Sequence, residues 1–316
     1  MKDLFEKTLD NYMEYQCSIS LMKDDVIKAL IEISASKDLQ SIKDLDKKRE
    51  LIHFYLEYGP GWIYIKKEML PYNFFSLDCC YSHTEYISKI LGRLVPIDLN
   101  GTVIKAVTAI DNNFSSKIVR GHMTSDSLSF HSDRSDLTLL NCYQDAMTGG
   151  ELKLVSSLEV ISFLRAQRKD YFEIITHKFP HDMRNEGKVN YIMLPILSFI
   201  EGNIGIRYIR KFTESVSRYG VELTAQEVDY LDAFDYAISQ CEMHMMLMKP
   251  TDLCILNNHI MLHARNAFDD SKDKKRMIYR TWINSEYTRQ LISDFLPIFG
   301  ECEAGANRGG IYSFEK

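Results

Sequence analysis

Short strand-like runs fill most of this 316-residue chain after its first fifth. Each run is rich in apolar, β-branched or aromatic residues, and segments with polar residues, Gly or Pro separate one run from the next. Many short strands with few helices between them are typical of a sandwich or a barrel. The pattern predicts strands at 62–65, 103–107, 128–130, 137–142, 152–155, 192–200, 204–209, 253–256 and 277–283.

Helical patterns stand before and between these runs. Residues 1 to about 58 place apolar side chains three and four positions apart among charged ones, which predicts helices. Ser156 is a suitable N-cap for a helix that follows it, and Thr224 with Glu227 forms a capping-box signature. We therefore expect a single domain over residues 1–316, made of a helical preface at 1–58, a mainly β core with helical insertions at 59–284 and a C-terminal extension at 285–316.

Composition excludes several classes of protein. Hydrophobic residues make up 45% and charged residues 26%, as in folded globular chains. A formal net charge of −6 gives no electrostatic reason to expect a nucleic-acid partner. No signal peptide or membrane-spanning stretch is visible, and seven cysteines without a C-x-x-C pair argue against a disulfide framework. We expect a cytoplasmic protein with reduced thiols, a small-molecule substrate and no membrane partner.

His131 and Asp133 are the first candidate metal ligands. They stand two residues apart beside a predicted strand, a spacing that puts both side chains on one face. A third ligand would come from a distant strand, where His259 and His263 are both available. Two histidines and one carboxylate leave open positions on an iron, as in non-haem Fe(II) oxygenases. Taken alone, His131 and Asp133 also fit a solvated surface pair.

The spacing of His259 and His263 also fits a zinc pair on a helix. The glutamate of H-E-x-x-H is absent, however, and the flanking residues favour a strand. The other histidines show no ligand spacing, so we expect them to be structural or on the surface.

Several motifs occur in a fixed order around these histidines. F-H-S-D at 130–133 is followed by T-G-G-E at 148–151, L-N-N-H-I-M-L-H-A-R at 256–265 and R-M-I-Y-R at 276–280. Together they resemble the taurine dioxygenase and clavaminate synthase-like family of Fe(II)/2-oxoglutarate oxygenases, over residues 59–284. The resemblance implies a mainly β fold with flanking helices (α+β), built on a double-stranded β-helix or jelly-roll core. It also implies Fe(II) bound by His131, Asp133 and His263, with 2-oxoglutarate and O2 as cosubstrates.

The resemblance assigns roles to two arginines as well. It implies that Arg276 pairs with the distal carboxylate of 2-oxoglutarate, and that Arg280 holds the cosubstrate or an anionic group of the substrate. The planar fork of a guanidinium suits a carboxylate and keeps its charge. Leu152 stands where the family usually has Ser or Thr, so a hydroxyl that helps to hold the cosubstrate would have to come from elsewhere, for example from Ser156.

Two polar segments are expected at the mouth of the site. Arg120, just ahead of the metal strand, is the substrate-binding residue we predict from them. His122, Asp182 and Arg184 are weaker candidates for the same role, since surface solvation is the simpler explanation for each of them.

These features predict a dioxygenase that oxidises an unactivated C–H bond of a small polar metabolite, by hydroxylation in the simplest case. The arginines favour a carboxylate-bearing substrate such as an amino acid or a derivative, free or tethered to a carrier. Halogenases of this fold lack the carboxylate ligand, so Asp133 favours oxygen transfer or desaturation. A non-catalytic ligand-binding or partner-binding β-barrel of the same fold is the alternative, and loss of a metal ligand would be its signature. A metal-dependent hydrolase would favour a fuller ligand set.

Overall fold

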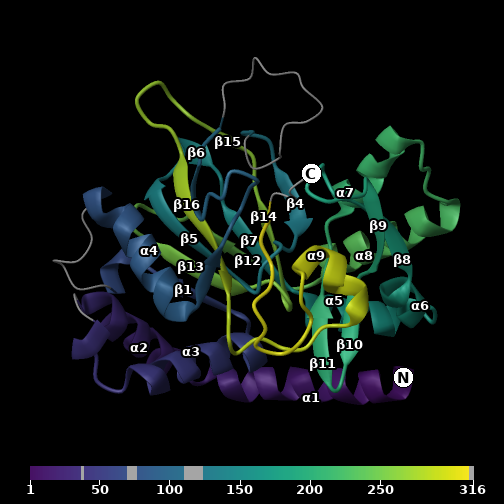
Figure 1. The fold of residues 1–316 in the computed structure, drawn as a ribbon, viewed down its shortest axis with the longest axis horizontal. Coiled ribbons are helices and arrows are strands. Elements are labelled where there is room, and N and C mark those ends of the chain that lie inside the picture. The colour runs from purple at the N-terminus through teal and green to yellow at the C-terminus, as the bar shows by residue number, and fades with distance from the viewer. Residues whose placement is uncertain (37–38, 70–76, 110–123, 313–316) are drawn as a thin grey trace.

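The computed structural model describes residues 1–36, 39–69, 77–109 and 124–312. Three helices form the N-terminal part, as the sequence predicts: α1 (Lys2–Ser20), α2 (Lys23–Ala35) and α3 (Leu45–Tyr58). They lie along one side of the molecule in Figure 1. The buried face of α1, with Phe5 and Leu9, packs into the same apolar cluster as the strands that follow. Apolar packing through α1 therefore attaches the N-terminal helices to the core.

A six-stranded antiparallel sheet forms one layer of the core. Its strand order is β1 (Trp62–Ile65), β13 (Leu253–Asn257), β5 (Leu137–Gln144), β16 (Met277–Asn284) and β2 (Arg93–Val95), and β3 (Ile104–Val107) also pairs with β16. Every residue of β13 is buried, because both faces of this strand are covered. This explains why residues 253–256 are all apolar and do not alternate with polar residues. Helix α4 (Cys80–Leu91), which the sequence pattern does not predict, packs against β16 and β5.

A four-stranded sheet forms the other layer, in the order β12 (His244–Met246), β7 (Leu152–Ser156), β14 (Met261–Arg265) and β4 (Leu128–His131). Apolar side chains of both sheets share one cluster, so the two layers pack together. They remain separate sheets, and the described strands close no barrel. The strand pattern predicts a sandwich or a barrel, and the described strands form two packed sheets, as in a sandwich.

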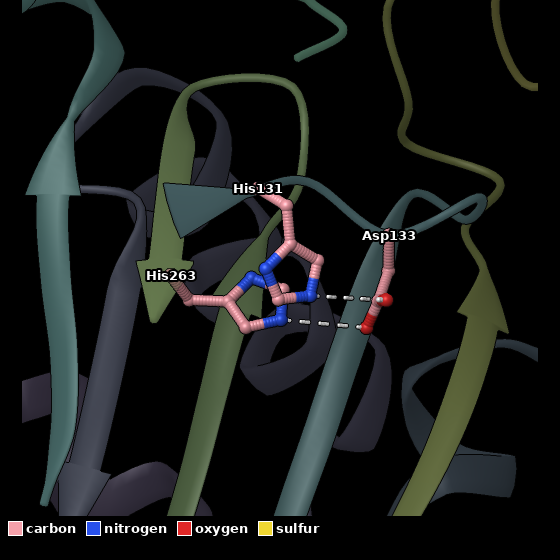
Figure 2. A group of neighbouring side chains, drawn as sticks. All are labelled: His131, Asp133 and His263. Carbon is pink, nitrogen blue, oxygen red and sulfur yellow. Dashed lines mark ion pairs between the residues drawn. The ribbon is translucent and has the colours of Figure 1, made fainter. Parts of the chain in front are cut away.

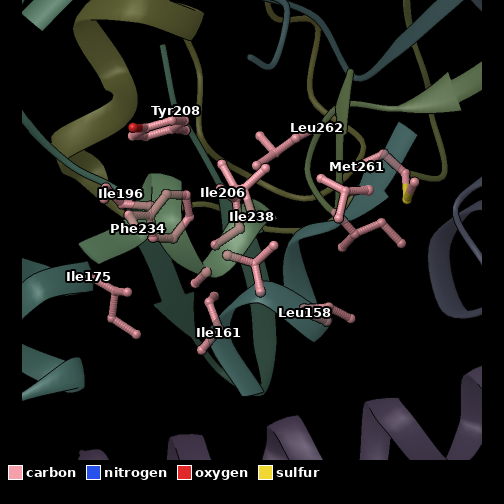
Figure 3. Packing of buried hydrophobic residues seen from close by; sticks show 14 of the residues in the cluster. Leu158, Ile161, Ile175, Ile196, Ile206, Tyr208, Phe234, Ile238, Met261 and Leu262 are labelled. Atoms are coloured by element: carbon pink, nitrogen blue, oxygen red, sulfur yellow. The ribbon is translucent and has the colours of Figure 1, made fainter. Parts of the chain in front are cut away.

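Helices α5 (Ser157–Gln167) and α8 (Ala225–Gln240) pack against each other beside the four-stranded sheet. Both predicted N-caps are confirmed: Ser156 Oγ accepts a hydrogen bond from the backbone N–H of Glu159, and Thr224 and Glu227 form the capping box. Figure 3 shows side chains of both helices, including Leu158 and Phe234, in one cluster with Met261 and Leu262 of β14. The back of the strand that carries His263 is therefore firmly packed.

Three short strand pairs and three short helices complete the described fold. The pairs are β6 (Thr148–Gly149) with β15 (Phe268–Asp269), β8 (Lys178–Asp182) with β9 (Tyr191–Pro195), and β10 (Leu197–Ile200) with β11 (Asn203–Ile206). The helices are α6 (Tyr171–Thr176), α7 (Arg210–Glu214) and α9 (Leu296–Phe299). Among the described helices, none is both long and apolar enough to cross a bilayer.

Two predicted strands differ from the structure. The single strand predicted at 192–200 is two strands, β9 and β10, because the chain changes partner after Pro195, which has no N–H to donate to a ladder. The strand predicted at 204–209 ends at Ile206. Beyond it, the chain runs alongside residues 131–133, and this path shapes the site described next.

Candidate metal centre

The structure brings His131, Asp133 and His263 together. His131 ends β4 and His263 lies directly opposite it on β14, with ring centroids 4.2 Å apart. Nε2 of His131 and Nε2 of His263 lie 3.9 Å and 3.6 Å from the carboxylate oxygens of Asp133. One possible ligand atom from each residue falls within 4.8 Å of the other two, and all three residues are buried (Figure 2).

Hydrogen bonding at these side chains favours a metal cation between them. Nδ1 of His131 lies 2.8 Å from the carbonyl of Ser129, which can only accept, so Nδ1 carries the proton in the neutral ring. Nε2 of His131 then presents a lone pair toward the Asp133 carboxylate, which is also an acceptor. Nδ1 of His263 has no hydrogen-bond partner among the described residues. Two imidazoles and a carboxylate that converge in a buried site are a ligand set that a divalent transition metal takes.

The protonation states agree with that geometry. Burial lowers the pKa of His263 to about 3 and also lowers the pKa of His131, so both rings are neutral near pH 7. Burial alone would raise the pKa of Asp133, but Arg280 and the two histidines hold it well below its usual range. Two neutral imidazoles and one carboxylate are the forms in which these groups bind metals.

Asp133 is fixed by a small polar network. Thr138 Oγ1 donates to Asp133 Oδ2 at 3.0 Å, and the backbone N–H of Asp133 donates to Asn258 Oδ1 at 3.0 Å. Asn258 Nδ2 donates in turn to Thr138 Oγ1 at 3.0 Å. Partners of this kind set the orientation of a metal-binding carboxylate.

A cavity of about 250 Å³ opens beside the centre. His131 and Asp133 line it together with Arg280, and apolar side chains such as Trp282 and Ile298 form other parts of its wall. Arg280 Nη1 lies 3.7 Å from Asp133 Oδ1, while its Nε has no hydrogen-bond partner among the described residues. A small concave chamber that combines apolar wall with many polar and charged side chains is suited to a small polar molecule.

Arg276 lies just before β16 and is buried, with 8% of its surface exposed. It does not line the cavity beside His131. Its guanidinium lies over the Phe268 ring at 5.2 Å, and within the described ranges no carboxylate forms an ion pair with it. Gly149 and Gly150 both have positive φ, and a Cβ on Gly150 would lie 3.1 Å from Arg276 Nε. The Gly-Gly motif therefore leaves room for a buried guanidinium.

Leu152 lies in the apolar core, paired with Arg265 of β14 and Met246 of β12. The hydroxyl of Ser156 serves as the cap of α5. Neither residue shows how a hydroxyl would replace the usual Ser or Thr.

The remaining candidates have different surroundings. Arg120 and His122 lie outside the described residues. Asp182 and Arg184 line the cavity, but Asp182 accepts a hydrogen bond from Arg218 Nη2 at 2.8 Å and one from Ser215 Oγ at 2.7 Å. His259 faces away from the centre and binds Asp136, with Nε2 2.8 Å from Oδ1.

Sequence reasoning missed four basic residues of the cavity wall: Arg134, His181, Arg207 and Lys211. Arg207 had a visible signal, because it is a charged residue inside the apolar run at 204–209. Arg134 follows Asp133 directly, and His181 looked like a structural histidine.

The chain is similar to several known proteins. FR-33289 synthase from Streptomyces rubellomurinus is 30% identical over an alignment of 186 positions, and the match covers 56% of this chain and 55% of that protein. The chain thus matches about half the length of this curated relative. Among solved structures, asparagine oxygenase (AsnO) has a TM-score of 0.59 at 14% identity and covers 92% of this chain and 97% of its own. The iron oxygenase OrfP, solved with Fe and alpha-ketoglutaric acid, has a TM-score of 0.53 at 14% identity and covers 84% and 92%.

At 14% identity, the similarity to AsnO and OrfP shows the fold alone. The family model of the taurine catabolism dioxygenase TauD, TfdA family matches residues 96–282, which include His131, Asp133, His263 and both predicted arginines. Because this match covers more than half of the chain, the chain belongs to the TauD/TfdA family, which uses Fe(II), 2-oxoglutarate and O2.

Proposed function

We propose that this chain is an Fe(II)- and 2-oxoglutarate-dependent dioxygenase that hydroxylates an unactivated C–H bond of a small anionic metabolite. The observation that carries the proposal is the convergence of His131, Asp133 and His263, whose possible ligand atoms lie within 4.8 Å of one another. Two histidines and one carboxylate leave metal positions free for a cosubstrate and O2. In this proposal the two packed sheets are the two halves of a double-stranded β-helix.

With 2-oxoglutarate and O2, Fe(II) supplies the oxidising chemistry when it is bound. The chain supplies the ligands and a chamber that limits access of water. Trp282 and Ile298 contribute apolar wall to that chamber, and Thr138 fixes the orientation of the Asp133 carboxylate.

Arg276 is the residue we propose for the distal carboxylate of 2-oxoglutarate. Its guanidinium is buried and forms no ion pair with a carboxylate of the described residues, although the Asp270 carboxylate accepts from the backbone N–H of Arg276 at 2.9 Å, and a buried guanidinium is more stable with an anion in direct contact. Arg280, beside Asp133, is then available for a second carboxylate, from the cosubstrate or from the substrate. An amino acid or an amino-acid derivative fits this arrangement, and one AsnO structure contains 3-hydroxyasparagine with succinate.

Cosubstrate saturation tests the proposal. We expect the purified protein to consume 2-oxoglutarate and to release succinate. Arg276→Ala should raise the KM for 2-oxoglutarate roughly 30- to 150-fold, because a charge-assisted contact is worth about 2–3 kcal/mol. Arg276→Lys keeps the charge and should raise that KM less.

Arg165→Ala is the matched control, since Arg165 pairs with Asp10 on the surface and should leave the KM unchanged. An unchanged KM in Arg276→Ala would move the role to another residue. Absence of 2-oxoglutarate turnover with every small acid tested would contradict the proposed function.

A further inference from the structure

We propose that Arg207, with Arg134 and His181 beside it, forms a subsite that binds an oxyanion group of the substrate. The inference rests on the proposed function, because it takes the cavity next to His131 as the substrate chamber. The subsite adds side chains that would anchor the substrate. None of them is one of the metal ligands or one of the two arginines at 276 and 280.

The path of the backbone places Arg207 beside the metal centre. The N–H of Ser132 donates to the carbonyl of Tyr208 at 3.0 Å, and His131 forms an isolated β-bridge with Ile209. In this extended segment, successive side chains point to opposite faces. Tyr208 packs into the apolar cluster shown in Figure 3, whereas Arg207 and Ile209 both line the cavity.

Arg207 is a buried cation that has fewer hydrogen-bond and ion-pair partners within the described part of the chain than a buried guanidinium needs. Only 7% of its surface is exposed. Its Nη1 donates to the carbonyl of Ser132, between the two metal-ligand candidates, and its Nε has no partner among the described residues. The ion pairs found in the described ranges include none for Arg207. This differs from Arg280, which has Asp133 at 3.7 Å.

Arg134 adds a second positive charge to the same wall. Its Nε donates to the carbonyl of Ile298, and no carboxylate of the described chain forms an ion pair with it. Burial lowers the pKa of Arg134 and of Arg207 to about 10, so both remain charged near pH 7. Two buried guanidinium groups without a carboxylate partner are unfavourable until an anion joins them.

No described acid of the cavity wall forms an ion pair with Arg134 or Arg207, although the charge of Asp133 acts on Arg207. Asp182 is bound by Arg218 and Ser215, and Asp133 belongs to the metal centre. The other lining acids, Asp126 and Glu186, form no ion pair with Arg207 or Arg134. The positive charge of this wall therefore remains for a ligand.

His181 supplies a third group. It lies on β8, is buried, lines the cavity and packs on the Phe212 ring at 5.4 Å. Burial and the charges of Arg207 and Arg134 hold its pKa well below the usual value, so the ring is neutral. A neutral imidazole still has one N–H, which can donate to an oxyanion. Guanidinium forks bind carboxylates and tetrahedral oxyanions alike, and that is the ligand chemistry we assign.

Direct anion binding tests the subsite without turnover. The purified full chain is titrated separately with inorganic phosphate, sulfate and acetate, and fluorescence of Trp282 in the cavity wall or the heat of binding is followed. We expect saturable binding of at least one probe, weakened about tenfold or more in Arg207→Gln and less in Arg207→Lys. Preference for acetate would indicate a carboxylate substrate, and preference for phosphate or sulfate a tetrahedral oxyanion.

Arg168→Gln is the matched control, because Arg168 pairs with Asp170 and Asp229 at the surface and should leave anion binding unchanged. Urea unfolding of each variant establishes that it is folded. Equal anion affinity in folded Arg207→Gln and wild type, or no saturable binding by the wild type, would overturn the subsite.

Iron binding by the same preparations separates the two proposals. Loss of anion binding in Arg207→Gln with no iron bound by the wild type would contradict the proposed function and leave the subsite. Normal iron binding with anion affinity independent of Arg207 would contradict the subsite alone.

Discussion

Two buried aspartates, Asp133 and Asp136, lie three residues apart in the same segment, yet their surroundings differ completely. Asp136 accepts hydrogen bonds from five groups of distant segments, all between 2.8 and 3.0 Å: His259, Asn284, the N–H of Ser285, Thr288 and Arg308. Asp133 accepts one from Thr138, and its oxygens face Nε2 of two histidines.

The difference separates a structural carboxylate from a ligand. Every oxygen of Asp136 has donors, and Arg308 with His259 holds its pKa well below the usual range despite burial. That network fixes residues 284–308 onto the core, and Ile298 and Ile311 of this C-terminal part complete the cavity wall. Asp133 has lone pairs that no described donor uses, which is what a metal ligand needs.

The two aspartates should differ most in how much stability is lost when an Asp→Asn substitution removes the charge of each. Asp136→Asn leaves Arg308 buried without its counter-charge and puts an NH2 among donors, which should lower the free energy of unfolding by about 3–5 kcal/mol. Asp133→Asn also removes the counter-charge of Arg280, but that contact is longer, at 3.7 Å, and the new amide can donate to the Nε2 lone pair of His131, so the loss in metal-free protein should be smaller, about 1–2 kcal/mol. Urea denaturation measures both. Equal losses would mean that the two aspartates have the same role.

Two threonines provide a finer, matched comparison. Thr138 and Thr288 are both buried, and each donates from Oγ1 at 3.0 Å to its aspartate. Thr138→Val should weaken metal affinity about 10- to 100-fold, since partners of ligating carboxylates tune the metal. Thr288→Val should leave metal affinity unchanged and lower the free energy of unfolding by about 1–2 kcal/mol. Metal titration with unfolding data for both variants decides this, and the reverse assignment would break the comparison.

A third comparison concerns acid stability around Asp136. Ser285, whose N–H binds Asp136, has its hydroxyl 3.1 Å from Nδ1 of His53. Burial and the charge of Arg49 lower the pKa of His53 to about 4, below the roughly 6.5 of an unfolded chain. Between pH 4 and pH 6.5 the unfolded chain binds more protons at His53 than the folded chain does. The contribution of the neutral His53 ring to the free energy of unfolding is therefore fully present above about pH 6.5 and is lost as the pH drops toward 4.

His53→Gln should reduce the slope of stability against pH in that window by at most about 1.4 kcal/mol per pH unit. Unfolding curves measured at several pH values give the slope. A slope identical to that of the wild type would show that His53 contributes nothing to the acid sensitivity.

The sequence predicted what local pattern determines. The capping residues Ser156 and Thr224, the N-terminal helices and most strands follow from periodicity and from side-chain hydrogen bonds within three residues. The spacing of His131 and Asp133 predicted that they share one face of a strand; the structure brings the two side chains together, although β4 ends at His131 and Asp133 lies beyond it. The choice between His259 and His263 needed the family resemblance, since both stand in one apolar segment and only the turn at 258–260 separates their directions.

The rest depends on contacts that sequence does not encode locally. The donors to Asp136 come from residues 259–308, so nothing around position 136 distinguishes it from Asp133. Arg207 faces the cavity because its segment pairs with residues 131–133, a pairing that only the folded chain reveals.

Anaerobic Fe(II) titration of the purified chain is the most direct test of the metal centre. We predict about one iron per chain for the wild type and none above background for Asp133→Asn and His263→Gln, because each loses one of three converging ligands. His244→Gln is the control, since His244 on β12 packs on Trp62 outside the centre and should keep about one iron. Full iron binding in Asp133→Asn and His263→Gln, or none in the wild type, would contradict the account.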